Sequence, residues 1–164
     1  SVLATTVGPY ARFGRQVVAA AADQGTHYAD LTGELLFVRW TLDEVDARAR
    51  ETGARIVHSC GFDSVPSDLG VLLTAQRAAS DGEGQLGETT LVVRSLRGGI
   101  SGGTLDSARQ QAIAVRADPT LRRLLADPYA LSPRRAAEPP AGPTLRPGRD
   151  PRTSIRAVVG APSE

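Results

Sequence analysis

A pattern of strand, loop and helix repeats three times in the first 80 residues, and it constrains the fold more than any other feature of the sequence. Apolar, β-branched runs predict strands over 1–7, 27–31 and 55–60, and helical spacing follows over 12–24, 35–52 and 64–80. The strands begin roughly 25–30 residues apart, which is typical of βαβ units. The sequence therefore predicts an α/β fold built on a parallel sheet with right-handed crossovers.

Residues at the ends of these helices are those that favour helix boundaries. Gly25 and Gly53 are placed to end the first and second helices, and Ser64 is placed to cap the third. Thr41 and Glu44 have the spacing of a capping box within the second helical region.

The apolar pattern also predicts which faces are buried. The first strand is apolar on both sides, so we expect helices to cover both of its faces. In the first helix the apolar residues Phe13, Val17, Ala20 and Ala21 fall at helical spacing. A later helix over 104–117 is expected to bury Leu105, Ala108, Ala112 and Val115.

The pattern of predicted elements changes after the turn-rich stretch 81–87, where we place a domain boundary. Residues 1–80 would form a first domain, and 81–130, with a strand over 88–96 and a glycine-rich loop before the later helix, would begin a second. Residues 131–164 are rich in Pro, Arg and Gly and are expected to be mostly irregular.

Composition excludes several functions. All 19 basic residues are Arg, so chemistry that needs a lysine, such as a Schiff base or a Walker-type phosphate loop, is excluded. A net charge of +1 does not favour binding to nucleic acid or to an anionic membrane. No long apolar run or secretion signal occurs, and a single Cys indicates a reducing, cytoplasmic location. The chain starts directly in a strand without Met, so we expect it to be an internal fragment of a longer protein.

Small-residue bends follow the three strands, and we expect them to lie at one edge of the sheet. They read TVGPY, LTGE and CGFDS and contain Gly8, Gly33 and Gly61. Ligands of open parallel sheets bind at the carboxyl ends of the strands. Glycines allow close approach to the backbone, and nearby helix N-termini are expected to offer free N–H groups to an anion.

Polar residues in these bends have both functional and structural interpretations. Tyr10 could donate a proton or bind a nicotinamide carboxamide, or its ring could simply pack. Asp30 and Glu34 could serve in acid–base catalysis, or Asp30 or Thr32 could cap the next helix while Glu34 interacts with its dipole. Asp63 is the better site candidate, although an Asx-turn accounts for it nearly as well.

His58 and Cys60 lie two residues apart and so share a face of the third strand. The pair could be half of a metal site, or a thiol with a neighbouring base. One Cys and two His are too few for a four-ligand zinc site, so we predict no metal and interpret Cys60 as a small buried residue.

Four blocks together carry a family resemblance: TTVGPYARFG, THYADLTGE, GARIVHSCGFDSVPSDLG and SGGT. In this order and spacing they resemble the saccharopine dehydrogenase-like oxidoreductases, most closely their trans-acting enoyl reductase branch. The resemblance covers about residues 1–150. It implies the C-terminal half of a Rossmann-like parallel sheet, strands four to six of the order 3-2-1-4-5-6, followed by the start of an α+β substrate domain.

The resemblance also implies a function and a set of site residues. The implied activity is hydride transfer from NAD(P), with NADPH the expected form, to an unsaturated acyl or lipid-type substrate. The expected cofactor-binding residues are Thr6, Gly8, Pro9, Tyr10, Gly61, Phe62 and Asp63. The expected substrate-binding residues are Thr32, Gly33, Glu34, Ser101, Gly102, Gly103 and Thr104, and Tyr10 and Asp63 are the expected catalytic residues.

The sequence departs from the family at its opening glycine-rich phosphate loop, which is absent here together with the acidic residue that binds the adenosine ribose. We therefore expect the isolated chain to be inactive. The alternative interpretation is a non-catalytic α/β module that binds a ligand or a partner. The first strand would lack its usual neighbour, so we also expect self-association through its exposed edge.

Overall fold

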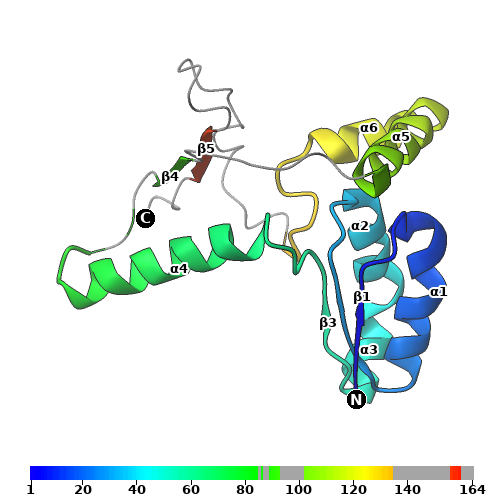
Figure 1. The fold of residues 1–164 in the computed structure, drawn as a ribbon, viewed down its shortest axis with the longest axis horizontal. Helices are drawn as coiled ribbons and strands as arrows, with labels where there is room; N and C mark the ends of the chain where they lie inside the picture. Colours follow the sequence, from blue (N-terminus) through cyan, green and yellow to red (C-terminus); the bar gives the residue numbers. More distant parts are fainter. Residues whose placement is uncertain (85, 87–88, 93–101, 135–155, 160–164) are drawn as a thin grey trace. The chain divides into compact units, whose positions relative to one another are not determined.

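The computed structural model describes residues 1–84, 86, 89–92, 102–134 and 156–159 (Figure 1). Two compact units make up the chain: Ser1–Phe62 with Ile100–Arg135, and Asp63–Gly99 with Ala136–Glu164. These units divide the chain differently from the expected domains 1–80, 81–130 and 131–164, whose boundaries stay predictions. No helix of the described residues combines the length and the apolar character needed to cross a membrane.

The first unit contains a three-stranded parallel sheet in the order β1-β2-β3, formed by β1 (Val2–Thr5), β2 (His27–Asp30) and β3 (Ile56–Val57). Tyr28 lies opposite Leu3 on one side and Ile56 on the other. The expected α/β fold with parallel early strands is therefore confirmed.

Helices α1 (Tyr10–Asp23), α2 (Leu35–Glu44) and α3 (Asp46–Thr52) pack with this sheet. Val18, Ala22, Tyr28 and Phe37 are at most 1% exposed and form the centre of the core. The expectation that helices cover both faces of the first strand is wrong for this unit. Val2 is 71% exposed, because the helices of the core lie on the side of Tyr28, and alternate strand residues face away.

The face that α1 buries does not follow the apolar spacing seen in its sequence. Phe13 and Val17 are exposed, and the buried residues are Tyr10, Gly14, Val18, Ala21 and Ala22. A Cβ on Gly14 would lie 3.0 Å from the Phe37 ring, so a glycine makes the close approach to α2. Gly25 ends the helix as expected, in the left-handed conformation (φ +63°), with Thr26 N–H bonded to Ala21 O and Gly25 N–H to Ala22 O.

The helical region 35–52 forms two helices rather than the one predicted. α2 ends at Glu44 and α3 begins at Asp46, with Val45 between them. The expected capping box is also wrong, since the Thr41 hydroxyl donates to Phe37 O within α2. Gly53 closes α3 with φ +77°, as expected.

Two further helices complete the first unit: α5 (Gly102–Ala117) and α6 (Pro119–Ala126). Asp118 caps the start of α6, where its carboxylate accepts from Thr120 N–H. The predicted buried face of α5 is wrong, because Leu105 is 60% exposed and Ala108 and Ala112 are exposed as well. The helix instead turns polar residues, among them Ser107, toward the rest of the unit.

The second unit contains α4 (Val65–Ser80) and an antiparallel pair of strands, β4 (Thr89–Val92) and β5 (Arg156–Val159). The predicted third helix is confirmed, but the Ser64 side chain forms no cap hydrogen bond at its start. The predicted strand over 88–96 is observed in its described part. β5 lies in the segment expected to be irregular, where the pairing with β4 gives it a regular conformation.

Candidate functional site

The three bends of the first unit meet at the carboxyl edge of the sheet, as parallel strands require. The Tyr10 hydroxyl joins the first two bends, donating to Thr5 O and accepting from Leu31 N–H, both at 3.2 Å. The Ser59 hydroxyl, directly before the third bend, donates to Thr32 O of the second bend at 2.7 Å. Hydrogen bonds therefore fix the bends to one another.

Asp30 is the centre of this network. Its Oδ2 lies 2.7 Å from His58 Nδ1, and its Oδ1 accepts from Thr32 N–H at 3.0 Å and from Ser59 N–H at 3.2 Å. The Asp30 side chain is fully buried. Burial alone would raise the pKa of this carboxyl, but the hydrogen bonds from His58, Thr32 and Ser59 outweigh it and lower the pKa.

The contacts of His58 indicate a structural role. Its ring packs edge-on against Tyr28 and Phe37, with centroid distances of 5.9 and 5.3 Å. His58 Nε2 and the Tyr28 hydroxyl are buried without a hydrogen-bond partner among the described residues. Burial and the neighbouring Asp30 carboxylate raise the pKa of Tyr28.

Ser59 follows His58 in a conformation that non-glycine residues seldom adopt, with φ +58°. Its N–H donates to the Asp30 carboxylate at the end of β2, and its hydroxyl donates to Thr32 O in the second bend. Cys60 N–H donates to Asp30 O at 2.7 Å, and its Sγ lies near the carbonyls of Val57 and His58. The Cys60 thiol therefore faces backbone oxygens.

Glu34 fills the N-terminus of α1. Its Oε1 accepts from Tyr10 N–H at 2.7 Å and its Oε2 from Ala11 N–H at 2.8 Å, while the Ser107 hydroxyl donates to Oε1 at 2.7 Å. The residue is 1% exposed. The expectation that this helix end offers free N–H groups to a ligand anion is wrong, because a carboxylate of the chain already occupies it. Glu34 therefore interacts with the dipole of α1.

Tyr10 is 5% exposed. Burial raises the pKa of its hydroxyl, the Leu31 N–H lowers it, and the charges of Asp30 and Glu34 raise it, for a net increase. The hydroxyl therefore stays protonated, with both its donor and acceptor functions used within the fold.

The remaining predicted site residues differ in accessibility. Thr6 is exposed, Gly8 half-buried and Pro9 buried at the first bend. Thr32 is buried at the second, where its hydroxyl accepts from Glu34 N–H, and Gly33 has open space where a Cβ would lie.

Of the third bend, Gly61 is buried and Phe62 is 91% exposed. Asp63 lies in the second unit, where its carbonyl accepts from the Ser67 hydroxyl. Ser101 lies outside the described residues, and Gly102, Gly103 and Thr104 form the exposed first turn of α5.

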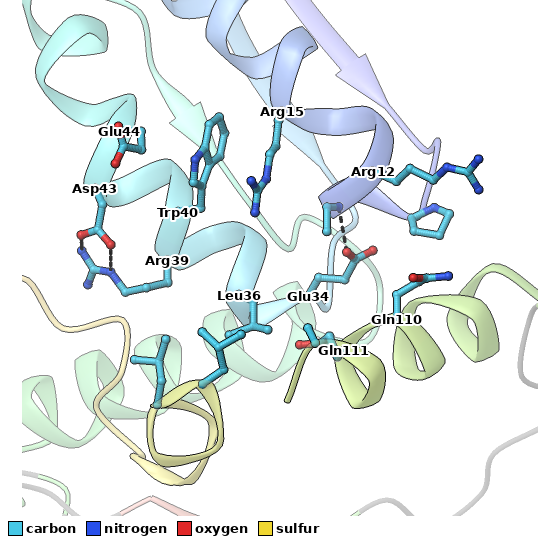
Figure 2. Close-up of a pocket in the computed structure, with 15 residues that line it drawn as sticks. Arg12, Arg15, Glu34, Leu36, Arg39, Trp40, Asp43, Glu44, Gln110 and Gln111 are labelled. Carbon is cyan, nitrogen blue, oxygen red and sulfur yellow. Dashed lines mark hydrogen bonds and ion pairs between the residues drawn. The ribbon is translucent and has the colours of Figure 1, made fainter. Parts of the chain in front are cut away.

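Sequence reasoning missed a cavity of about 480 Å³ beside these bends (Figure 2). Residues of the first bend and of α1, α2, α5 and α6 line it. Arg15 and Trp40 lie side by side in its lining, with the Arg15 guanidinium 4.8 Å from the centre of the Trp40 ring. The spacing of Leu36, Trp40 and Asp43, which places them on one face of α2, was the available signal.

The chain is similar to mycobacterial proteins named for one activity. A Mycobacterium tuberculosis (strain H37Rv) protein with a provisional trans-acting enoyl reductase name is 55% identical over 142 residues, which are 87% of this chain and 34% of that protein. The trans-acting enoyl reductase of Mycobacterium ulcerans is 50% identical, and that of Mycobacterium bovis (strain BCG) 48% identical, each over 91% of this chain and 37% of theirs. The chain thus spans about a third of the length of these relatives. No protein-family model and no solved structure matches it.

Proposed function

We propose that the chain is part of an NAD(P)-dependent oxidoreductase that reduces an unsaturated acyl or lipid-type substrate by hydride transfer. The observation that carries this proposal is the 48–55% identity to proteins named trans-acting enoyl reductase. The four blocks that resemble the saccharopine dehydrogenase-like oxidoreductases support it. So does the position of the bends at the edge where open parallel sheets bind ligands.

The described residues fit one half of a dinucleotide better than the other. Glu34 occupies the N-terminus of α1, so that helix end cannot hold a pyrophosphate. The exposed ring of Phe62, the exposed Thr6 and the open space at Gly33 fit a flat nicotinamide and its ribose. We propose that this edge holds the nicotinamide end, with NADPH the expected form.

The bound nicotinamide would supply the hydride, and the chain would supply position and polarity. Phe62 would stack on the ring and Gly8 would allow its approach to the first bend. The buried, fully bonded hydroxyl of Tyr10 favours a positioning role over direct proton donation. Asp63 remains the proposed proton-transfer residue, and the first turn of α5, Gly102–Thr104, is proposed to face the substrate.

One observation favours the alternative, a non-catalytic module that binds a ligand or a partner. The polar groups of Tyr10 and Glu34 are used in bonds that hold the bends together.

Fluorescence titration with NADPH, on this chain and on a longer protein that contains it, tests the proposal. We expect the longer protein to bind NADPH and to oxidise it in the presence of an enoyl thioester. Phe62→Ala should weaken NADPH binding about threefold to tenfold through lost stacking. Phe13→Ala, which removes another exposed ring on α1, should leave binding unchanged. Absence of NADPH binding by the longer protein would contradict the proposal and favour the alternative.

A further inference from the structure

We propose that the cavity between α1, α2, α5 and α6 binds the apolar chain of an amphipathic anion, with Trp40 against the chain and Arg15 at the anionic head. The identification of this apolar ligand chain with the acyl group of the substrate rests on the proposed function, and the rest of the proposal does not. The ligand class follows from the lining of the cavity.

The cavity has the size and the mixed lining of a small-molecule site. Its volume of about 480 Å³ lies within the range of roughly 300–1,000 Å³ that is usual for such pockets. Apolar side chains from three helices line it: Leu36, Trp40, Ala114, Leu121 and Leu124. This surface fits an alkyl chain or a similar apolar body.

Two cations of the lining, Arg12 and Arg15, form no ion pair with a described residue, and only Arg15 lies against Trp40. Glu34 is bound to the N-terminus of α1 and to Ser107, and Asp43 pairs with Arg39. The Arg15 guanidinium lies over the face of the Trp40 ring, 4.8 Å from its centre.

The other two charged residues of the lining set the expected orientation. The Arg12 guanidinium lies over Phe13, and Figure 2 shows its side chain pointing away from Trp40. In the same view Trp40 lies between Arg15 and Glu44. An anionic head would be repelled by Glu44 and attracted to Arg15, so we place the head at the α1 side of the cavity.

Gln110 and Gln111 of α5 line the same cavity. Their amide groups can donate hydrogen bonds to a carboxylate or to a phosphate. The shared chemistry of the ligand is therefore a single apolar chain with a carboxylate or phosphate head.

The experiment uses Trp40 as the reporter, since it is the sole tryptophan of the chain. The chain is titrated with decanoate, decyl phosphate, decanol and inorganic phosphate, each below the concentration at which micelles form. We expect saturable blue shifts with the two anionic amphiphiles, weaker binding of decanol, and none of phosphate alone. Lengthening the chain should tighten binding by up to about fourfold per CH₂ while the cavity has room.

A decanoate with bromine on its terminal carbon tests where the alkyl group binds in the unsubstituted protein. Bromine quenches tryptophan fluorescence only at close range. We expect it to quench Trp40 with the same saturation as unlabelled decanoate. Absence of saturable quenching would overturn the proposal, as would equal affinity for decanoate and decanol.

Three variants distinguish the contribution of the anionic head to binding from that of the apolar alkyl chain. Each variant is checked for folding by circular dichroism. Arg15→Gln should weaken both anions about tenfold, equivalent to about 1.4 kcal/mol, and leave decanol unchanged. Ala114→Phe should weaken every amphiphile by filling the cavity. The matched control Arg50→Gln, on α3 outside the cavity, should change nothing. Equal effects of Arg15→Gln and Arg50→Gln would overturn the assignment of the head.

This assay contains no nicotinamide, so it fails or succeeds independently of the proposed function. Arg15-dependent binding together with a longer protein that does not bind NADPH would refute only the oxidoreductase. The reverse result would refute only the cavity assignment. Capture of a helix or a peptide by the cavity in place of the amphiphiles would also count against it.

Discussion

Replacement of Asp30 by Ala is expected to destabilise the first unit more than any exposed charge change. The carboxylate accepts from His58 Nδ1, Thr32 N–H and Ser59 N–H, and it is fully buried. Alanine removes both carboxylate oxygens and so breaks all three bonds at once. The substitution would remove the carboxylate that links the second bend to the backbone and side chain of residues 58 and 59.

The magnitude follows from these three bonds. A buried donor left without its acceptor costs about 1–3 kcal/mol, and three such donors would sum to more than that. They share one carboxylate and are not additive, so we take about 3–5 kcal/mol, the range for removing one partner of a buried pair. This is a large part of the roughly 5–15 kcal/mol that stabilises an ordinary domain.

Asp30→Asn gives a second, milder measurement. The amide oxygen can still accept from Thr32 and Ser59, while its NH₂ must find an acceptor on His58 Nδ1. The bonds lose their charge assistance, which costs about 1 kcal/mol for each bond and so about 1–3 kcal/mol in all.

Urea unfolding at pH 7, followed by Trp40 fluorescence and by far-UV circular dichroism, measures both variants. Asp23→Ala is the control, because the Asp23–Arg48 ion pair is exposed and should contribute about 0–1 kcal/mol. A loss below about 1 kcal/mol for Asp30→Ala, or one no larger than that of the control, would refute the reasoning from the buried network.

Four further predictions follow from the same structure. The stability difference between the unsubstituted chain and Asp30→Asn should be complete above the ordinary pKa of 3.8 and shrink as the pH falls through the lower folded pKa, because the unfolded chain binds a proton on Asp30 more readily than the folded chain does. Urea titrations from pH 6 to about 2.5 measure this difference, and a constant difference would contradict the prediction. Gly25→Ala should cost about 1–2 kcal/mol in denaturant unfolding, because φ is +63° and the added Cβ would lie 3.1 Å from Thr52 O; Gly53→Ala, with open space around it, should cost less. Glu34→Gln should cost about 2 kcal/mol and speed hydrogen exchange at Tyr10 and Ala11, since one acceptor oxygen is replaced by a donor; unchanged exchange at both amides would contradict the cap. Sedimentation should show concentration-dependent association through β1, which pairs only with β2 among the described strands, and a stable monomer would contradict it.

Local signals in the sequence predicted the path of the backbone well. The spacing of apolar runs predicted three parallel strands, and Gly25 and Gly53 marked helix ends correctly. These features depend on residues close together in sequence. Patterns of glycine and β-branched residues report on such conformations directly.

Helix orientation was predicted less well because packing depends on the partner surface. On α1, Gly14 makes the close contact with Phe37, and a count of apolar residues gives a glycine no weight. Phe13 and Val17, which fall at the apolar spacing, are exposed. On α5, the inward face includes Ser107 because Glu34 needs a donor, which the sequence of α5 alone does not indicate.

The Asp30–His58 pair could have been found from the sequence with one further step. With Tyr28 opposite Ile56 and Ala29 opposite Val57, the next positions along parallel strands are Asp30 and His58. Considering each residue on its own strand suggested a helix cap for Asp30 and a metal ligand or base for His58. The pairing appears only when the register between the strands is considered.

The bond between Ser107 and Glu34 spans 73 positions of sequence. Chimaeras between relatives exchange contiguous blocks, and a crossover placed anywhere between these two residues takes the serine from one parent and the carboxylate from the other. Such a hybrid keeps the bond only where both parents carry compatible side chains at the two positions. Libraries that recombine this chain with its relatives should therefore inherit Glu34 and Ser107 together.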